Sequence, residues 1–441
     1  MKIPQRPPGQ VEYWEALGSG SEKLNLMFDY VTGPMVNDRY VHWDKLRRLE
    51  PPEGIDHKLW WAGLKLRRRI GTKSIELRDP VGNPFSFNLV DPLPERLHQV
   101  DSGARGFIGA PEVITNRETR DHYVVRSLIE ESITSSLLEG ASATRDVAKK
   151  MIRENRPPRN RSERMILNNY RTMEKIRAIK DQELSKELVF EIQRLVTEST
   201  LDNPSGAGRF RRPDETIVIG DEQGMVFHAP APAQSLDDRM DKMCAFANAR
   251  SPEGFVHPMI RSMILHFWLA YDHPFVDGNG RTARALFYWS MLRQGYWLFE
   301  FVSISRIILQ SPVQYGRAFL HTETDDNDLT YFLLYHAEVI RKAVDELHEY
   351  LDRKTRRLRQ AESELRGLRG LNPRQRSLVS HALRHLGESY TIEGHRSSHA
   401  VVPQTARADL LDLVARGLFS QEKVGRIWNF RAVPDLEDRL S

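Results

Sequence analysis

The stretch that decides the fold of this chain is the loop His273-Pro-Phe-Val-Asp-Gly-Asn-Gly-Arg-Thr-Ala-Arg284. Helical spacing is present on both sides of it. Pro258 and the apolar residues after it predict a helix that ends near Tyr271, and a second helix follows the loop and ends at Gly295. The second half of the loop therefore lies at a helix N-terminus, where free backbone N–H groups and the helix dipole attract anions. We predict a phosphate-binding loop with a histidine and a carboxylate at its mouth.

The same string resembles the signature of the Fic family, a His, a Phe two residues later, then Asp/Glu-Gly-Asn-Gly-Arg and a second Arg. The resemblance implies a mainly all-α fold, a helical bundle with a β-hairpin flap. It also implies transfer of a nucleoside monophosphate, usually AMP from ATP, to a protein hydroxyl. Retention of Gly278 and Gly280 favours this reaction over the phosphate transfer of the related Doc branch. A glycine-rich helix cap with a locally bonded His273 is the alternative without chemistry.

The residue types in the loop fit that reaction. His273 is the side chain of the loop whose ordinary pKa suits a base at neutral pH. Asp277 is the expected ligand of Mg²⁺, which would bridge phosphate oxygens. The expected phosphate contacts are Gly278, Asn279, Gly280, Arg281 and Arg284. A metal site made of His266, His273 and Asp277 is an alternative interpretation, which gives the glycines and arginines of the loop no role.

A second motif lies upstream of the loop. Residues 120–140 have the spacing of an amphipathic helix that ends in Ser135-Ser-Leu-Leu-Glu139-Gly140. A glutamate in the last helical turn is unfavourable by about 0.3 kcal/mol or more unless a cation is nearby. Ser135 and Glu139 share one face and resemble the inhibitory motif of the Fic family. In that family the glutamate pairs with the second arginine of the signature, here Arg284, so the resemblance implies autoinhibition.

The sequence predicts two hairpins. Residues 74–78 and 85–89 alternate as strands around a turn, within an N-terminal α+β extension (1–105) whose role the sequence does not reveal. The second hairpin joins residues 225–228, through the turn 220–224, to Thr216, Ile217, Val218 and Ile219. The family resemblance implies that this hairpin is the flap, which holds a target segment by strand-like pairing. A purely structural edge hairpin is the alternative.

Helical spacing also covers residues 161–200, 236–246 and 307–319, and a long helix is predicted over 329–368. The charged second half of the long helix is predicted to be a spacer, with a dimer contact, and hence a homo-oligomer, as the alternative. Residues 372–437 have the order of a winged helix, namely short helices and then a hairpin. If that domain docks on DNA, the contacts expected are Gln404, Thr405 and Arg407 in the groove and Lys423 and Arg426 on phosphates. A protein-contact module is the other interpretation.

Length and composition set limits on these predictions. The 441 residues suffice for two or three domains, predicted as 1–105, a Fic domain over 106–368, and 372–437. A net charge of +4 argues against nucleic-acid binding over the whole surface. The single cysteine excludes an internal disulfide framework and favours a cytoplasmic protein. We see neither a secretory signal at residues 1–9 nor an apolar run long enough to enter a membrane.

We therefore expect a protein adenylyltransferase that uses ATP and Mg²⁺ to place AMP on a hydroxyl of a target protein or of itself, restrained by Glu139. Two other functions stay open. One is a DNA-bound regulator that uses the Fic site to sense nucleotide, although a sensor needs no base such as His273. The other is a hydrolase that removes AMP from a modified target, since a glutamate such as Glu139 could position water.

Overall fold

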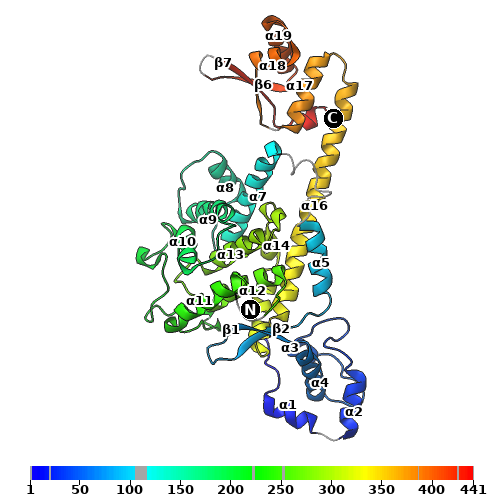
Figure 1. Ribbon diagram of the computed structural model, residues 1–441, viewed down its shortest axis with the longest axis vertical. Helices are drawn as coiled ribbons and strands as arrows, with labels where there is room; N and C mark the ends of the chain where they lie inside the picture. The colour runs from blue at the N-terminus through cyan, green and yellow to red at the C-terminus, as the bar shows by residue number, and fades with distance from the viewer. Residues whose placement is uncertain are drawn as a thin grey trace. The chain divides into compact units, whose positions relative to one another are not determined.

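The computed structural model describes residues 2–18, 21–104, 117–220, 224–250, 254–385, 387–424 and 427–440. The chain divides into two compact units, Met1–Arg105 with Leu128–Val344, and Gly106–Ser127 with Asp345–Ser441. Helices α7 (Arg117–Leu138) and α16 (Thr330–Gly367) contribute residues to both units. Among the described residues, strands form three small sheets and helices make up most of the fold (Figure 1). The predicted mainly helical class is confirmed.

The N-terminal part of the first unit has a small core of its own. Three of its tryptophans are buried there, Trp43, Trp60 and Trp61. The elements are α1 (Gln10–Leu17), α2 (Ser21–Tyr30), α3 (Trp43–Leu46), α4 (His57–Ile70), β1 (Lys73–Arg78), β2 (Pro84–Phe87) and α5 (Leu93–Ala104). The predicted antiparallel hairpin of β1 with β2 is confirmed.

The centre of the first unit is a helical bundle, whose members lie together in Figure 1. Its helices are α8 (Arg145–Arg153), α9 (Arg161–Ala178), α10 (Lys186–Thr197), α11 (Leu236–Ala247), α12 (Pro258–Asp272) and α13 (Asn279–Arg293). Helices α12 and α13 pack against each other and are buried along almost their whole length, and their buried residues include charged side chains such as Arg261, Arg281 and Arg284. Helices α9 and α10 pack against α13. This bundle fixes both ends of the 273–284 loop.

The predicted flap strand is shorter than expected. Strand β3 covers only Ile219–Gly220 and pairs with β4 (Val226–His228), so Thr216, Ile217 and Val218 precede it. The prolines at 230 and 232 follow β4 and cannot donate to a ladder, which removes the partners that a longer strand would need. Residues 221–223 of the predicted turn lie outside the described residues.

The single helix predicted over residues 307–319 is wrong. Two helices occupy this region, α14 (Ile304–Gln310) and α15 (Pro312–Thr324). The helix breaks at Ser311, which has φ −152° and ψ 68°, because Pro312 has no N–H and excludes the residue before it from the helical conformation. Pro312 then occupies the first turn of α15, where its missing N–H costs nothing.

The long predicted helix is confirmed as α16, which has 38 residues. The Asp328 carboxylate starts it by accepting a hydrogen bond from the Thr330 N–H at 3.0 Å. In the part of the chain that is described, no helix pairs the length with the apolar composition that crossing a bilayer requires. In α16, the arginine-rich second half is too charged for such a crossing.

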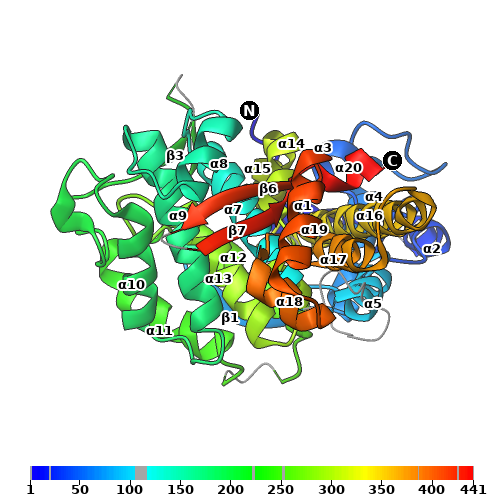
Figure 2. The same ribbon diagram turned by 90° about the horizontal axis from the view of Figure 1, so that it is seen from above.

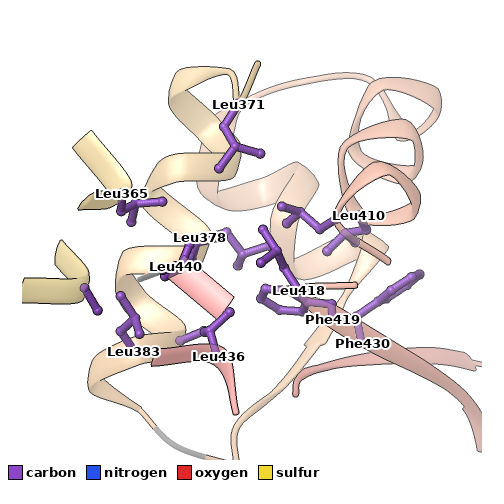
Figure 3. Close-up of a cluster of buried hydrophobic side chains, with 14 residues drawn as sticks. Leu365, Leu371, Leu378, Leu383, Leu410, Leu418, Phe419, Phe430, Leu436 and Leu440 are labelled. Carbon is purple, nitrogen blue, oxygen red and sulfur yellow. The ribbon is translucent and has the colours of Figure 1, made fainter. Parts of the chain in front are cut away.

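The second unit contains short helices and a three-stranded antiparallel sheet of order β5-β7-β6, whose longer strands lie side by side in Figure 2. Its elements are α17 (Pro373–Arg384), β5 (Ser389–Thr391), α18 (Ile392–His399), α19 (Pro403–Ala415), β6 (Phe419–Val424), β7 (Ile427–Ala432) and a terminal turn, α20 (Leu436–Leu440). Leu383, Leu410 and Phe430 are among the side chains that point into its core (Figure 3). Helix α18 was not predicted, and the winged-helix assignment stays a prediction.

Candidate active site

The loop between α12 and α13 turns the chain through two left-handed residues. His273, which follows α12, has φ 46°, and Gly278, which precedes α13, has φ 82°. A Cβ on Gly278 would lie 2.7 Å from the Thr197 Cγ2 atom, so a side chain there meets both strain and a clash. The loop therefore places residues 278–281 at the first turn of α13, as the sequence predicts.

Side chains from outside the loop hold its backbone. The Arg211 Nε donates to the His273 carbonyl oxygen at 3.0 Å, and the Gln193 Nε2 donates to the Asp277 carbonyl oxygen at 3.0 Å. Phe275 is fully buried beside the rings of Phe190 and Phe210. Arg211 and Gln193 were not predicted, and the only sequence signal was a basic run, Arg209-Phe-Arg211, after two glycines.

Asn279 shapes the loop instead of facing a ligand with its side chain. Its Oδ1 accepts from the Phe275 N–H at 2.9 Å, and its Nδ2 donates to the Phe275 carbonyl oxygen at 2.8 Å. The amide is buried. Because both ends of the amide are used, the predicted phosphate contact of Asn279 is left to its backbone N–H, which lies in the first turn of α13.

His273 is placed as a neutral base. Its Nδ1 lies 3.3 Å from the Ala270 carbonyl oxygen, which can only accept, so Nδ1 carries the proton and Nε2 keeps its lone pair. Burial lowers the pKa of His273 to about 4, and the Ala270 carbonyl and the Glu139 charge only partly offset that effect. The imidazole is therefore neutral at physiological pH and able to take a proton.

Asp277 offers a carboxylate at the edge of the loop. Its side chain is 36% exposed, and its Oδ1 accepts from the Gly278 N–H at 2.5 Å. The Arg281 Nη2 lies 3.4 Å from Oδ1, and the Arg161 Nη2 lies 3.7 Å from Oδ2. A single exposed carboxylate next to a phosphate-binding backbone fits Mg²⁺, which takes one or two carboxylates and completes its shell with phosphate oxygens and water.

Arg281 is buried under the loop. Its Nη1 donates to the Val196 carbonyl oxygen at 3.0 Å, which fixes the guanidinium to the C-terminal end of α10. Among the described residues, its Nε has no hydrogen-bond partner. A buried donor of this kind is costly unless a ligand completes it. The structure thus brings Arg281 to the place that the sequence predicts, beside the first turn of α13.

Arg284 is held by both residues of the predicted inhibitory motif. Its Nη2 donates to the Glu139 Oε1 at 2.8 Å and to the Ser135 carbonyl oxygen at 3.0 Å, and its Nε donates to the Ser135 Oγ at 2.8 Å. Burial acts to raise the pKa of Glu139, but the charge and hydrogen bond of Arg284 outweigh it, so this pKa is lowered. Glu139 is therefore an anion paired with the second arginine of the signature.

The Glu139 carboxylate also rests on the loop backbone. A Cβ on Gly280 would lie 2.1 Å from the Glu139 Oε1 and 3.2 Å from the Arg284 Nη1. Gly280 therefore leaves the space that this carboxylate fills. An anion already lies against the first turn of α13, where the helix N-terminus and the arginines attract negative charge.

Glu131 holds the helix that carries Glu139. Its carboxylate is buried and accepts from the Tyr288 hydroxyl and the Ser303 Oγ, both at 2.8 Å, and from the Ser305 N–H at 3.1 Å. Glu131 was not predicted from the sequence. The sequence feature that could have revealed it is the position of this glutamate next to the apolar stripe of residues 120–140, where a buried side chain is expected.

The rival metal site is wrong, because His266 is not available to bind a metal. Its Nδ1 lies 2.8 Å from the His336 Nε2, and its Nε2 lies 2.9 Å from the Tyr315 hydroxyl. The ring is fully buried, and burial, with His336 and Arg284 nearby, holds its pKa well below the ordinary value. His266 is a core histidine whose two nitrogens are both hydrogen-bonded.

The flap strand β4 is tied to the loop's surroundings by His228. The His228 Nδ1 lies 2.7 Å from the Glu323 Oε2 and the Nε2 lies 2.7 Å from the Tyr271 carbonyl oxygen, so both nitrogens face acceptors. Burial lowers the pKa of His228, but these partners outweigh it and the pKa is raised. Of the four predicted flap residues, Thr216 and Val218 are exposed, Val218 at 52%.

The residues predicted to contact DNA lie apart from this site in sequence, in the second unit. Gln404 and Arg407 are exposed and Thr405 is half-buried in the first two turns of α19. Lys423 lies in β6 over the ring of Trp428, and Arg426 lies outside the described residues. This placement does not test the DNA hypothesis.

Comparison with known proteins was made on sequence and on fold. Residues 183–291 match the model of the Fic/DOC family. A protein adenylyltransferase Fic from Nematostella vectensis is 31% identical over 117 residues, 26% of this chain and 25% of the relative. One from Drosophila ananassae is 32% identical over 94 residues, 21% of this chain and 17% of the relative. This chain thus spans a quarter or less of the length of these relatives.

A crystal structure of a Fic family protein from Desulfovibrio desulfuricans has the same fold over most of this chain. The TM-score is 0.51 at 17% sequence identity, and the match covers 81% of this chain and 99% of the other. The segment that matches the family contains α10 to α12, most of α13 and the complete loop from His273 to Arg284. The family match, the loop and the helices that carry it together show that residues 183–291 are a Fic/DOC-family domain.

Proposed function

We propose that this chain transfers AMP from ATP to a hydroxyl group of a protein and that Glu139 restrains the transfer. The proposal rests on the Glu139 carboxylate, which accepts a hydrogen bond from Arg284 and fills the space beside Gly280. An anion in this place indicates that the loop binds anions, and its origin in another helix indicates control. The relatives named protein adenylyltransferase Fic support the same reaction class.

His273 removes the proton from the attacking hydroxyl. The hydroxyl oxygen forms a bond to the α-phosphorus of ATP, the bond to the bridging oxygen breaks, and pyrophosphate leaves. The proton passes to Nε2 of His273, because Nδ1 already carries one. General-base help of this kind is worth about 10²–10⁴ in rate.

The phosphates are held by groups that are already in place. In this proposal the N–H groups of the first turn of α13 and the buried Arg281 bind the α- and β-phosphates, and Arg284 takes the terminal one. Mg²⁺ held by Asp277 would neutralise charge on the leaving group. Loss of one such donor typically costs about 10²–10³ in rate.

Glu139 and the terminal phosphate compete for Arg284. One guanidinium cannot give the same hydrogen bonds to both anions, so ATP that binds beside Glu139 must hold its phosphates elsewhere. The α-phosphate then misses the line of attack from the hydroxyl. A displacement of about 1 Å costs on the order of 10²-fold in rate. The inhibited protein therefore still binds nucleotide but transfers AMP slowly.

Labelled ATP tests the reaction class. We expect the Glu139→Gly protein with Mg²⁺ to take up label from α-labelled ATP and not from γ-labelled ATP. In the same background, His273→Ala should abolish uptake while nucleotide affinity stays within about threefold, because the histidine contributes proton transfer and the loop contributes binding. Label from the γ-position, or equal uptake with His273→Ala, would reject the proposal.

A further inference from the structure

A cluster of metal-binding side chains lies in the second unit, outside every role described above. His381 belongs to the last turn of α17, His385 is the C-cap residue of that helix, and Glu388 immediately precedes β5. One ligand atom from each residue lies within 4.8 Å of the other two. Across the described parts of the chain, this is the one group of three such residues that meets this condition.

The two histidines have the spacing that allows joint binding of one ion. Residues four apart on a helix lie one turn apart on the same face. Their imidazole rings stack with centroids 3.9 Å apart and planes inclined by 23°. Two histidines at this spacing form half of the ligand set in helical zinc sites.

The third ligand and a supporting hydroxyl lie beside His381. The Glu388 Oε2 is 3.5 Å from the His381 Nδ1, and the Tyr390 hydroxyl is 2.9 Å from the same nitrogen. The Tyr390 ring packs against Phe419 at the edge of the core and its hydroxyl holds the His381 Nδ1, which leaves the His381 Nε2 for the ion. Metal-binding histidines are usually oriented by such a partner, whose loss typically costs 10–100-fold in affinity.

The charge and the geometry suit a small divalent ion. Helix α17 ends here, and the free carbonyl groups of a helix C-terminus favour positive charge. With Zn–N distances of about 2.0–2.1 Å, the ligand atoms of a tetrahedral site are about 3.4 Å apart. The side chains must therefore approach by about 1 Å, which rotation allows, because the side chains of His381 and Glu388 are 48% and 43% exposed.

We propose that His381, His385 and Glu388 bind one divalent ion of the zinc class, with water in the fourth position. Two imidazole nitrogens and one carboxylate oxygen select such an ion over Mg²⁺, which prefers oxygen ligands. The bound ion joins the end of α17 to β5, because Glu388 is covalently continuous with β5. Strand β5 pairs with β7, so the ion also connects α17 to the sheet.

Titration of the full-length protein with ZnCl₂ tests the site directly. After removal of any affinity tag and of bound metal with EDTA, calorimetry at about pH 7.5 should show a saturable zinc site. His385→Ala and Glu388→Gln should each lower its affinity at least about tenfold. His399→Ala is the matched control: His399 is also four residues from a histidine, but that partner, His395, has its Nε2 3.2 Å from the Asp409 carboxylate.

Cobalt absorption provides a second measurement that does not depend on heat. Co²⁺ bound by three protein ligands and water should give visible bands of a four-coordinate ion, and Glu388→Gln should weaken them. Glu388 is exposed, so this variant should fold even if His385→Ala does not. Absence of saturable zinc binding, or affinity that Glu388→Gln leaves unchanged, would overturn the proposal. AMP transfer is not measured, so this outcome is independent of the proposed function.

Discussion

At the residue scale, the protonation state of His273 makes a prediction about pH. A base must be neutral, and burial lowers the pKa of His273 to about 4, so protonation removes activity only as the pH falls toward that value. In the Glu139→Gly background, kcat/KM for ATP should be flat between about pH 6 and 8 and fall below about pH 5. The Glu139 charge raises this pKa, so its removal does not move the fall to higher pH.

The pH profile of kcat should differ in a defined direction. Bound ATP adds negative charge near the imidazole and favours its protonated form, so kcat should begin to fall at a higher pH than kcat/KM. Rates measured across the pH series, with the protein shown to be folded at each value, separate the two profiles. A half-maximal kcat/KM near pH 6.5, the ordinary range of histidine, would contradict the burial argument.

Individual residues were predictable where the resemblance to the Fic family implied their partners. The contact of Glu139 with Arg284 could be expected on that basis, and the unfavourable charge of a glutamate at a helix end agreed with it. The role of Asn279 could not be predicted, because its side-chain amide forms both of its hydrogen bonds with Phe275 within the loop. The roles of Gln193 and Arg211 could not be predicted either, since the carbonyl groups that they bind come close only after the helices pack.

At the scale of elements, helix α7 depends on the buried carboxylate of Glu131. Glu131→Ala leaves the Ser303, Ser305 and Tyr288 donors without their acceptor, and we expect a loss of about 3 kcal/mol in unfolding free energy. A loosened α7 should also hold Glu139 less firmly and raise AMP transfer, though less than Glu139→Gly does.

Chemical denaturation and labelled ATP measure these two effects. The matched control is Asp146→Ala, which removes an exposed carboxylate from the neighbouring helix α8 and should change neither quantity. A folded Glu131→Ala protein with unchanged label uptake would show that α7 does not need this carboxylate to hold Glu139 in place.

Elements were predictable where hydrophobic periodicity is long. Helices α12, α13 and α16 each repeat apolar residues over several turns, and all three are present. Helix α18 was missed because it has eight residues and its one buried side chain is a histidine. Pro312 marks the break between α14 and α15 in the sequence. Because the apolar spacing continues across this proline, the two helices were predicted as one.

At the scale of the whole molecule, truncation tests which region is needed for AMP transfer. The residues proposed for catalysis end at Arg284, so a protein that ends after about Arg369 should fold and keep the AMP-transfer rate of the full chain within about threefold. Circular dichroism checks the fold and labelled ATP checks the rate, both in the Glu139→Gly background. A folded truncated protein without activity would show that the C-terminal region contributes to the reaction.

The sequence bounds the number of domains but not how elements combine into units. Helices α7 and α16 each contribute residues to both compact units, and a single hydrophobic repeat along a helix does not reveal such sharing. The winged-helix assignment of residues 372–437 and its DNA contacts stay proposals. Short helices and a hairpin fit a protein-contact module equally well, and the net charge of +4 favours neither.

The proposed restraint of AMP transfer by Glu139, through its contact with Arg284, is the step on which the rest of the proposed function depends. The most direct measurement compares label uptake from α-labelled ATP by the wild-type and Glu139→Gly proteins, with ATP affinity measured on both. We predict an increase of about 10²-fold with little change in affinity. Glu139→Asp should release partly and Ser135→Ala weakly, since the serine only steadies the contact. Uptake that is unchanged or lower in a folded Glu139→Gly protein would contradict the claim.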